Sequence, residues 1–210
     1  MAESLEADAG GRRAKAKAAN RQAILEAARN VFARIGFEAT TVRDIIRETD
    51  LAAGTFYNYF KSKEEVFEAL SDQSTRRFRD VLAGVRAEAT DFESYIRFAY
   101  RAYFSFVREE HEEARAAGAA QHMLVGVRVD TPEMLAVIDE IRADLERHFE
   151  AGDVPDLDTE YLTAAAVGIA REMGDFMLRR DPVDVEGAAA FASKLLLAGV
   201  DARGMRNCCQ

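Results

Sequence analysis

Apolar residues recur at intervals of three and four positions along most of the chain, which is the spacing of one face of an amphipathic α-helix. Strict alternation of apolar and polar residues, which would indicate half-buried strands, is nearly absent. The pattern therefore predicts an all-α protein. The predicted helices begin near Arg21, Thr41, Ala52, Ser62, Asp91, Pro132, Thr159 and Val185.

Several of these boundaries carry a residue that favours the end of a helix. Gly36 follows the first predicted helix and is expected to act as its C-terminal cap. Thr41 is a good N-cap for the next helix, and Pro132 suits the first position of a later one. Ser62, with Glu65 three residues on, predicts a capping box at the start of a long helix.

The segment 91–110 is apolar around most of its circumference. Its polar residues form one narrow stripe, made of Glu93, Arg97, Arg101, Ser105 and Arg108. A helix of this kind is buried on nearly all sides. We therefore expect it to lie at the centre of its domain.

Two short predicted helices joined by a tight turn lie between Thr41 and Phe60. This is the arrangement of a helix-turn-helix, whose second helix enters the major groove of DNA. Gly54 and Thr55 keep the surface of that second helix low, so that it can approach base edges. The small core of the pair is expected to contain Ile45, Ile46, Leu51 and Phe56. Donors for phosphates and bases follow at Tyr57, Asn58, Tyr59 and Lys61.

The charge of the chain is unevenly distributed, although its net value of −9 argues at first against binding to nucleic acid. Residues 1–63 carry 11 Lys+Arg and 8 Asp+Glu, a net charge of +3, whereas the rest carries 17 and 29, a net charge of −12. A basic head concentrates the attraction for phosphate at one end of the chain. Basic residues also precede the first core positions, either as a solvated charge run or as an arm that contacts DNA: Arg12, Arg13, Lys15, Lys17 and Arg21.

Residues 24–66 resemble the TetR family of bacterial transcription regulators. The similarity rests on Gly36-Phe37, on the segment 40–45, and on the run Gly-Thr-Phe-Tyr-Asn-Tyr-Phe at 54–60, which is followed by Lys61. It implies an N-terminal three-helix DNA-binding domain and a larger helical domain that binds an effector and forms a dimer. The DNA-binding residues inferred from the segment and the resemblance are Arg21, Thr41, Arg43, Ala53, Gly54, Thr55, Tyr57, Asn58, Tyr59 and Lys61.

Three positions depart from the family pattern. Asp50 stands in the turn where the family often has glycine, and aspartate tolerates a left-handed conformation better than most residues. Ala52 replaces a frequent serine cap, a loss of about 1 kcal/mol of helix stability. Ala53 occupies a position where the family often has a basic residue. Fewer phosphate contacts are therefore expected from the recognition helix.

The resemblance also divides the chain into four parts. These are a disordered, partly basic N-terminal arm (1–20), a DNA-binding domain (21–66), a helical ligand-binding and dimerisation domain (67–202) and a flexible tail (203–210). The last two helices are expected to form a homodimer, and a symmetric dimer would match two half-sites of palindromic double-stranded DNA. Small residues allow close packing there, either between subunits or within one chain: Ala164, Ala165, Ala166, Gly168 and Ala170.

An effector pocket is expected among aromatic and methionine side chains of the larger domain. The candidate ligand-binding residues are Tyr95, Phe98, Tyr103, Phe106, His122, Met123, Glu172, Met173 and Phe176. Such a lining, without a clear charge cluster, favours a bulky apolar effector such as an acyl chain or an aromatic compound. The leading prediction is a ligand-responsive repressor that releases its operator when this effector binds. The alternatives left open are a regulator controlled by a protein partner and a transcriptional activator.

Enzymatic activity and a bound metal or other cofactor are not expected. The three histidines, His111, His122 and His148, lack metal-ligand spacing. The two cysteines, Cys208 and Cys209, are adjacent and lie near the C-terminus, where an inert tail is expected. No apolar run reaches the length of a membrane span, and residues 1–11 have no signal-peptide core. We therefore expect a cytoplasmic protein.

Overall fold

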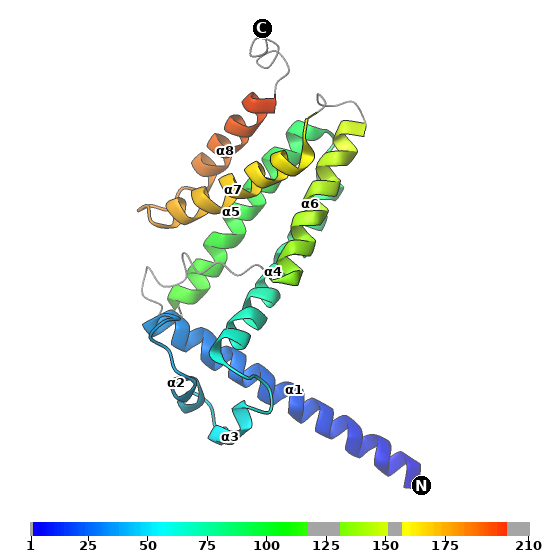
Figure 1. Cartoon of the computed structure of the whole chain (residues 1–210), viewed down its shortest axis with the longest axis vertical. Coiled ribbons are helices and arrows are strands. Elements are labelled where there is room, and N and C mark those ends of the chain that lie inside the picture. Colours follow the sequence, from blue (N-terminus) through cyan, green and yellow to red (C-terminus); the bar gives the residue numbers. More distant parts are fainter. Residues whose placement is uncertain (1, 117–130, 151–156, 201–210) are drawn as a thin grey trace. The chain divides into compact units, whose positions relative to one another are not determined.

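The computed structural model describes residues 2–116, 131–150 and 157–200, with side chains from Arg13 onward. All regular secondary structure within these residues is α-helical (Figure 1), which confirms the predicted fold class. None of these helices combines the length and apolar character needed to cross a membrane. The helices are α1 (Ala2–Ile35), α2 (Val42–Arg47), α3 (Ala53–Phe56), α4 (Lys63–Glu88), α5 (Phe92–Ala116), α6 (Pro132–Glu150), α7 (Thr159–Leu178) and α8 (Val185–Val200).

The chain forms two compact units. Among the described residues, the first comprises residues 2–71 and 114–116, and the second comprises residues 72–113, 131–150 and 157–200. The division between them falls inside α4, after Ser71, whereas the sequence placed it between residues 66 and 67. Each unit has its own hydrophobic core.

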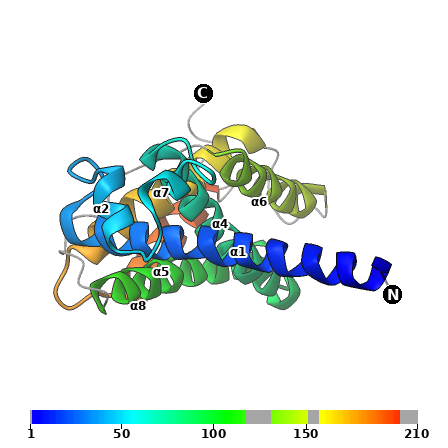
Figure 2. The same cartoon turned by 90° about the horizontal axis from the view of Figure 1, so that it is seen from below.

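The first unit is built on α1, which is much longer than the predicted helix starting at Arg21. It runs unbroken from Ala2 to Ile35, and its N-terminal part extends past α2 and α3 (Figures 1 and 2). The expectation of a disordered arm over residues 1–20 is therefore wrong for residues 2–20. The physical reason is composition, because alanine, lysine, arginine and glutamate all have high helix propensity.

The core of the first unit joins α1 to the two short helices. Ile24, Leu25, Ala28 and Phe32 of α1 pack with Ile45 of α2, Phe56 of α3 and the following Phe60. Ile45 and Phe56 are completely buried, as the sequence predicted, while Ile46 and Leu51 are partly buried. These contacts fix the direction of α3 relative to α1.

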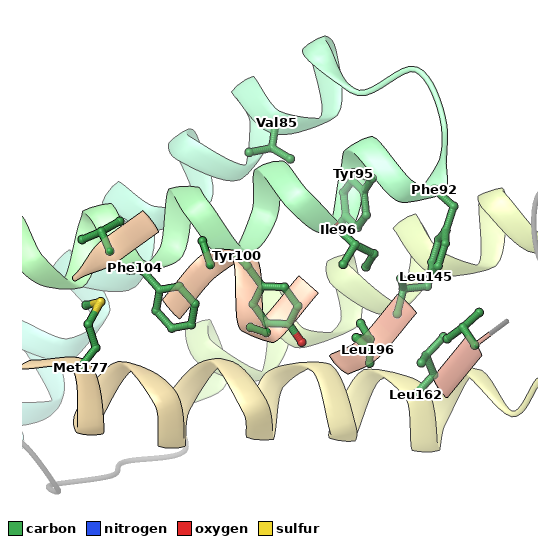
Figure 3. Packing of buried hydrophobic residues seen from close by; sticks show 14 of the residues in the cluster. Val85, Phe92, Tyr95, Ile96, Tyr100, Phe104, Leu145, Leu162, Met177 and Leu196 are labelled. Carbon is green, nitrogen blue, oxygen red and sulfur yellow. The ribbon is translucent and has the colours of Figure 1, made fainter. Parts of the chain in front are cut away.

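The second unit is built around α5, as its all-round apolar surface predicted. Phe92, Tyr95, Ile96, Tyr100 and Phe104 of this helix are all buried in the core. Figure 3 shows these side chains between the neighbouring helices, with Phe104 facing Met177 of α7. The Tyr100 hydroxyl donates a hydrogen bond of 3.2 Å to the carbonyl oxygen of residue 166, and burial raises its pKa above the ordinary value.

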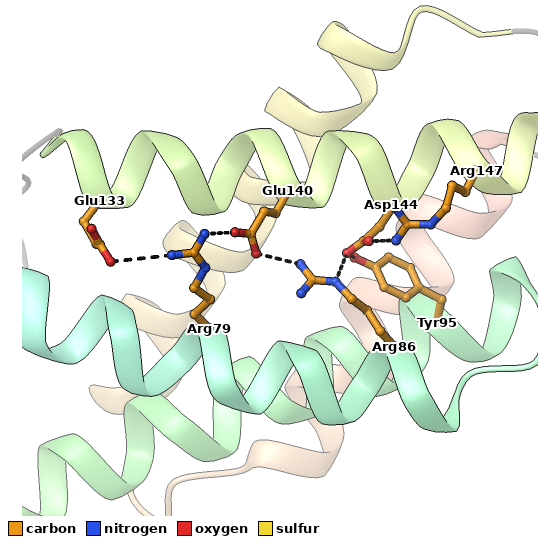
Figure 4. Close-up of polar contacts among 7 residues, drawn as sticks. All are labelled: Arg79, Arg86, Tyr95, Glu133, Glu140, Asp144 and Arg147. Carbon is orange, nitrogen blue, oxygen red and sulfur yellow. Dashed lines mark hydrogen bonds and ion pairs between the residues drawn. The ribbon is translucent and has the colours of Figure 1, made fainter.

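A ladder of ion pairs joins α4 to α6 within the second unit (Figure 4). Arg79 donates to Glu140, and Arg86 donates both to Glu140 (3.1 Å) and to Asp144 (2.7 Å). The Tyr95 hydroxyl also donates a bond, of 2.9 Å, to Asp144, which accepts a further bond from Arg147. Burial and the nearby Asp144 carboxylate raise the pKa of Tyr95, so its hydroxyl remains a donor. We name this set of side chains the α4–α6 ladder.

Candidate nucleic-acid interface

The first helix of the motif, α2, is held by a reciprocal cap. The backbone N–H of Asp44 donates to the Thr41 hydroxyl oxygen (3.3 Å), and the Asp44 carboxylate accepts from the Thr41 backbone N–H (3.0 Å) and hydroxyl (2.6 Å). These bonds lower the pKa of the Asp44 carboxyl group. The predicted cap at Thr41 is confirmed, and so is Gly36, whose positive φ of 84° ends α1. This left-handed backbone conformation favours glycine, because glycine has no Cβ atom.

The turn between α2 and α3 differs from the sequence prediction. Asp50 was expected to adopt a left-handed conformation, but no non-glycine residue in the described part of the chain has a positive φ. Thr49 holds the turn instead. Its hydroxyl donates to the carbonyl oxygen of Ile46 (2.9 Å) and accepts from the N–H of Leu51 (3.2 Å), a local pattern that competes with helix continuation.

The recognition helix α3 is shorter than expected. It covers Ala53–Phe56 rather than residues 52–59, and the chain continues through a turn in which the N–H of Asn58 donates to the carbonyl oxygen of Thr55 (3.1 Å). Its N-cap residue is Ala52, whose extended backbone (φ −65°, ψ 144°) has cap geometry but no side-chain cap bond. A helix of a single turn without a side-chain cap depends on tertiary packing for its stability.

Replacing Ala52 with serine should therefore stabilise the protein. A serine hydroxyl at this position can accept from a free N–H of α3 without any change in the backbone, which is worth about 1 kcal/mol. The free energy of unfolding, measured by urea denaturation, should rise by that amount. The control is Ala53→Ser, at the neighbouring exposed position inside the helix. An equal gain in unfolding free energy from both variants would contradict the capping explanation.

Packing below α3 determines which side chains face outward. Phe56 and Phe60 are buried, while the intervening Tyr57 is 63% exposed. The Asn20 side-chain amide of α1 donates to the Tyr59 hydroxyl (3.3 Å). The Arg21 guanidinium lies 5.0 Å from the centre of the Phe60 ring. Both contacts tie the chain after α3 to α1.

The ten predicted DNA-binding residues lie on the surface of the first unit. Thr55 and Tyr59 are partly buried, and the others are exposed: Arg21, Thr41, Arg43, Ala53, Gly54, Tyr57, Asn58 and Lys61. A Cβ atom added to Gly54 would meet nothing within 4 Å. The small size of Gly54 therefore serves no packing within this unit, and it leaves the exposed surface of α3 low enough for close approach by another molecule.

The candidate effector residues lie in different surroundings. Tyr95 belongs to the α4–α6 ladder, whereas Phe98, Glu172 and Phe176 are exposed. Another group does come together: Tyr103 and Phe106 each have ring centres 5.4 Å from that of Phe78, and Tyr103 and Met173 pack against the core. His122 and Met123 lie outside the described residues, as do Cys208 and Cys209.

The second unit contains a buried carboxylate that the predicted site residues do not include. Asp144 is 2% exposed and accepts hydrogen bonds from three side chains. The helical periodicity of α6 offers one sequence signal for the burial of Asp144. Val137 and Leu145 are buried, and Asp144 follows Val137 by seven residues, which places it on the same helix face. A carboxylate on an apolar face predicts a buried partner.

The last two helices each expose an apolar stripe. On α7, Tyr161 is 79% exposed and Phe176 is 62% exposed, with the small exposed residues Ala165 and Gly168 between them. On α8, Phe191 (62%) and Leu195 (51%) are exposed at four-residue spacing. Exposed large apolar residues on neighbouring helices are typical of a protein–protein interface.

The geometry of the first unit defines a class of protein. Two short helices joined by a tight turn are fixed against a longer helix, and the second presents small and polar groups to solvent, so this unit is a helix-turn-helix domain of the kind that binds DNA. Residues 24–70 match the family described as "Bacterial regulatory proteins, tetR family". This match agrees with the resemblance to that family seen in residues 24–66, and it extends over this segment of the chain.

Relatives in sequence share mainly this domain. Over 44 residues the chain is 52% identical to the uncharacterized HTH-type transcriptional regulator YfiR of Bacillus subtilis, covering 21% of this chain and 22% of that protein. Over 64 residues it is 38% identical to the HTH-type transcriptional repressor AcnR of Corynebacterium glutamicum, covering 30% and 34% of the two chains. The matches thus span between 22% and 44% of the length of these curated relatives.

Solved structures show that the likeness of fold extends over most of the chain. The fatty acid degradation regulator FadR of Bacillus halodurans has a TM-score of 0.68 at 24% identity, covering 86% of this chain and 96% of that one. FadR of Bacillus subtilis, in complex with stearoyl-CoA, has a TM-score of 0.69 at 20% identity, covering 85% and 98%. RolR in complex with resorcinol has a TM-score of 0.63 at 19% identity, covering 92% and 93%.

Proposed function

We propose that this protein is a transcription regulator that binds double-stranded DNA as a homodimer and represses the genes beside its operator. The exposed surface around Gly54 carries this proposal, because it combines a low helix face with phosphate and base donors on both sides. The repressor assignment draws support from the similarity to AcnR. A dimer through the stripes of α7 and α8 would present two such surfaces to successive major grooves.

Selection of DNA from a random duplex pool tests this proposal. The full chain should enrich palindromic sequences whose half-sites are about one helical turn apart. A fluorescence titration with the enriched duplex should then show much tighter binding than with a scrambled duplex of equal length. Failure to enrich any sequence, with no binding even at low salt, would contradict DNA recognition.

We further propose that a small apolar effector releases the DNA. Two proteins with the same fold are described in complex with stearoyl-CoA and with resorcinol, and the apolar cluster of Phe78, Tyr103 and Phe106 lies in the second unit of this chain. An effector acts only if it binds the two conformations with different affinity. Mass spectrometry of molecules released from purified protein should identify an acyl or aromatic compound, and adding it should weaken DNA binding. A preparation without such a compound, insensitive to stearoyl-CoA and resorcinol, would favour control by a protein partner.

Lys61 provides a specific test of the DNA-binding surface. Its side chain is exposed beside the turn that follows α3, so Lys61→Gln should weaken binding to every duplex and reduce the slope of log K against log salt by about one. The control is Arg97→Gln, which removes the same charge from an exposed position on α5. Equal effects from both variants would show that net charge, rather than a contact, sets the affinity.

A further inference from the structure

The N-terminal extension of α1 has a charged side of its own. Residues 12–21 contain five basic and no acidic residues, in a chain whose net charge is −9. The side chains of Arg13, Lys15 and Lys17 are all exposed, and no hydrogen bond or ion pair with another described residue engages them. Their charges are therefore available to an external partner.

The contacts of α1 show which side of this helix faces the recognition segment. Asn20 bonds to the Tyr59 hydroxyl, and Arg21 lies over the Phe60 ring. These adjacent positions lie about 100° apart around an α-helix. The side of α1 between Asn20 and Arg21 therefore faces the chain that follows α3.

Lys17 and Arg13 continue this same side of the helix. Lys17 precedes Arg21 by four residues, and Arg13 precedes Lys17 by four, so all three lie in one row on the helix surface. Lys15 lies about 160° around the helix from Lys17, because two residues turn by about 200°. At a rise of about 1.5 Å per residue, Lys17 and Arg13 lie about 6 and 12 Å beyond Arg21 along the axis.

We propose that the row Arg13, Lys17 and Arg21 binds the phosphate backbone of the DNA duplex held by the recognition segment. This proposal rests on the proposed DNA-binding function and adds a second contact region to it. Backbone phosphates are the partner because the row carries three positive charges, spaced along one side of a helix, which attract the regularly spaced phosphate charges of any duplex sequence. A preformed helix loses less conformational entropy on binding than a disordered arm would, and these contacts offset the missing basic residue at Ala53.

The test compares two single substitutions that remove the same charge from the same helix. The full chain, Lys17→Gln and Lys15→Gln are titrated with a 40-base-pair duplex of random sequence over a range of salt concentrations. Lys17→Gln should bind several-fold more weakly and lower the salt slope by about one, and Arg13→Gln/Lys17→Gln should lower it by about two. Lys15→Gln should keep the slope of the unmodified protein. Circular dichroism should show equal thermal midpoints for all variants, because the replaced side chains are exposed.

The outcomes separate this proposal from the proposed function. Equal effects of Lys15→Gln and Lys17→Gln would overturn it, because a long-range field rather than one helix face would then act on the DNA. Unchanged slopes in all variants, together with a lowered slope in Lys61→Gln, would also overturn it while leaving DNA binding intact. An unmodified chain that binds no DNA would instead contradict the proposed function itself.

Discussion

Replacement of Asp144 by alanine is expected to lower the free energy of unfolding by about 3 kcal/mol. The Asp144 side chain is only 3% exposed, and its removal leaves the Arg86 guanidinium, itself 25% exposed, without its shortest ion pair. The buried hydroxyl of Tyr95 also loses its acceptor. A buried donor without a partner retains its desolvation cost, which explains the size of the effect. Urea denaturation monitored by circular dichroism gives the value.

The matched control for this substitution is Asp139→Ala on the same helix. Asp139 is 67% exposed and forms an ion pair of 3.1 Å with Arg142, and an exposed pair contributes at most about 1 kcal/mol. Tyr95→Phe should fall between the two, at about 1 kcal/mol, because it removes one hydrogen bond and leaves the charges paired. A loss for Asp144→Ala no larger than that for Asp139→Ala would mean that the α4–α6 ladder does not hold these helices together.

The second large effect is expected at the proposed dimer surface. Leu195→Glu places a carboxylate in the exposed apolar stripe of α8, where Leu195 is 51% exposed. If this stripe is the interface, the charge must be buried without a partner, and the dimer should weaken by at least about 30-fold, or 2 kcal/mol. Light scattering after size-exclusion chromatography should then show a monomer. Affinity for a palindromic duplex should fall with it, because a monomer occupies a single half-site.

The chain offers a close control for Leu195→Glu. Leu135 on α6 is also a leucine and is 50% exposed, so Leu135→Glu introduces the same side chain at almost the same exposure. It should leave the oligomeric state unchanged. A dimer that persists in Leu195→Glu, or that is lost equally in Leu135→Glu, would place the interface elsewhere.

Local chemistry explains why the DNA-binding motif could be located from the sequence. Gly36 ends α1 because only glycine adopts its left-handed conformation at low cost, and Thr41 starts α2 through bonds to a residue three positions away. Both signals act within a few residues, and a linear pattern records them. The apolar periodicity of the segment likewise predicts the burial of Ile45 and Phe56, and both side chains are completely buried.

The length of the recognition helix α3 could not be predicted from such local signals. Residues 57–59 contain neither glycine nor proline, yet α3 ends at Phe56. After Phe56 the chain forms a turn, in which the N–H groups of Asn58 and Tyr59 donate to the carbonyl oxygens three residues earlier (3.1 and 2.9 Å), and Phe60 packs in the same core as Phe56. Tertiary packing overrides a weak local preference in such a case.

The effector residues show the same limit for side chains. Helical periodicity places Phe98, Tyr103 and Phe176 among the apolar positions of their helices, but it does not reveal which neighbouring side chain covers each of them. In the structure Phe98 and Phe176 are exposed, whereas Tyr103 packs against Phe78 of α4. Which of these residues contact an effector remains a prediction.

The sequence by itself determined the helical class, the caps of α1 and α2, and the surface composition of the recognition segment, since each depends on residues that are near neighbours along the chain. Only the tertiary structure decided that Asp144 is buried among donors from α4 and α5, and that Lys17 and Lys15 lie on opposite sides of a helix tied to Tyr59 and Phe60. These features join residues 39 to 58 positions apart. Contacts over such separations depend on how whole helices pack, which no local pattern specifies.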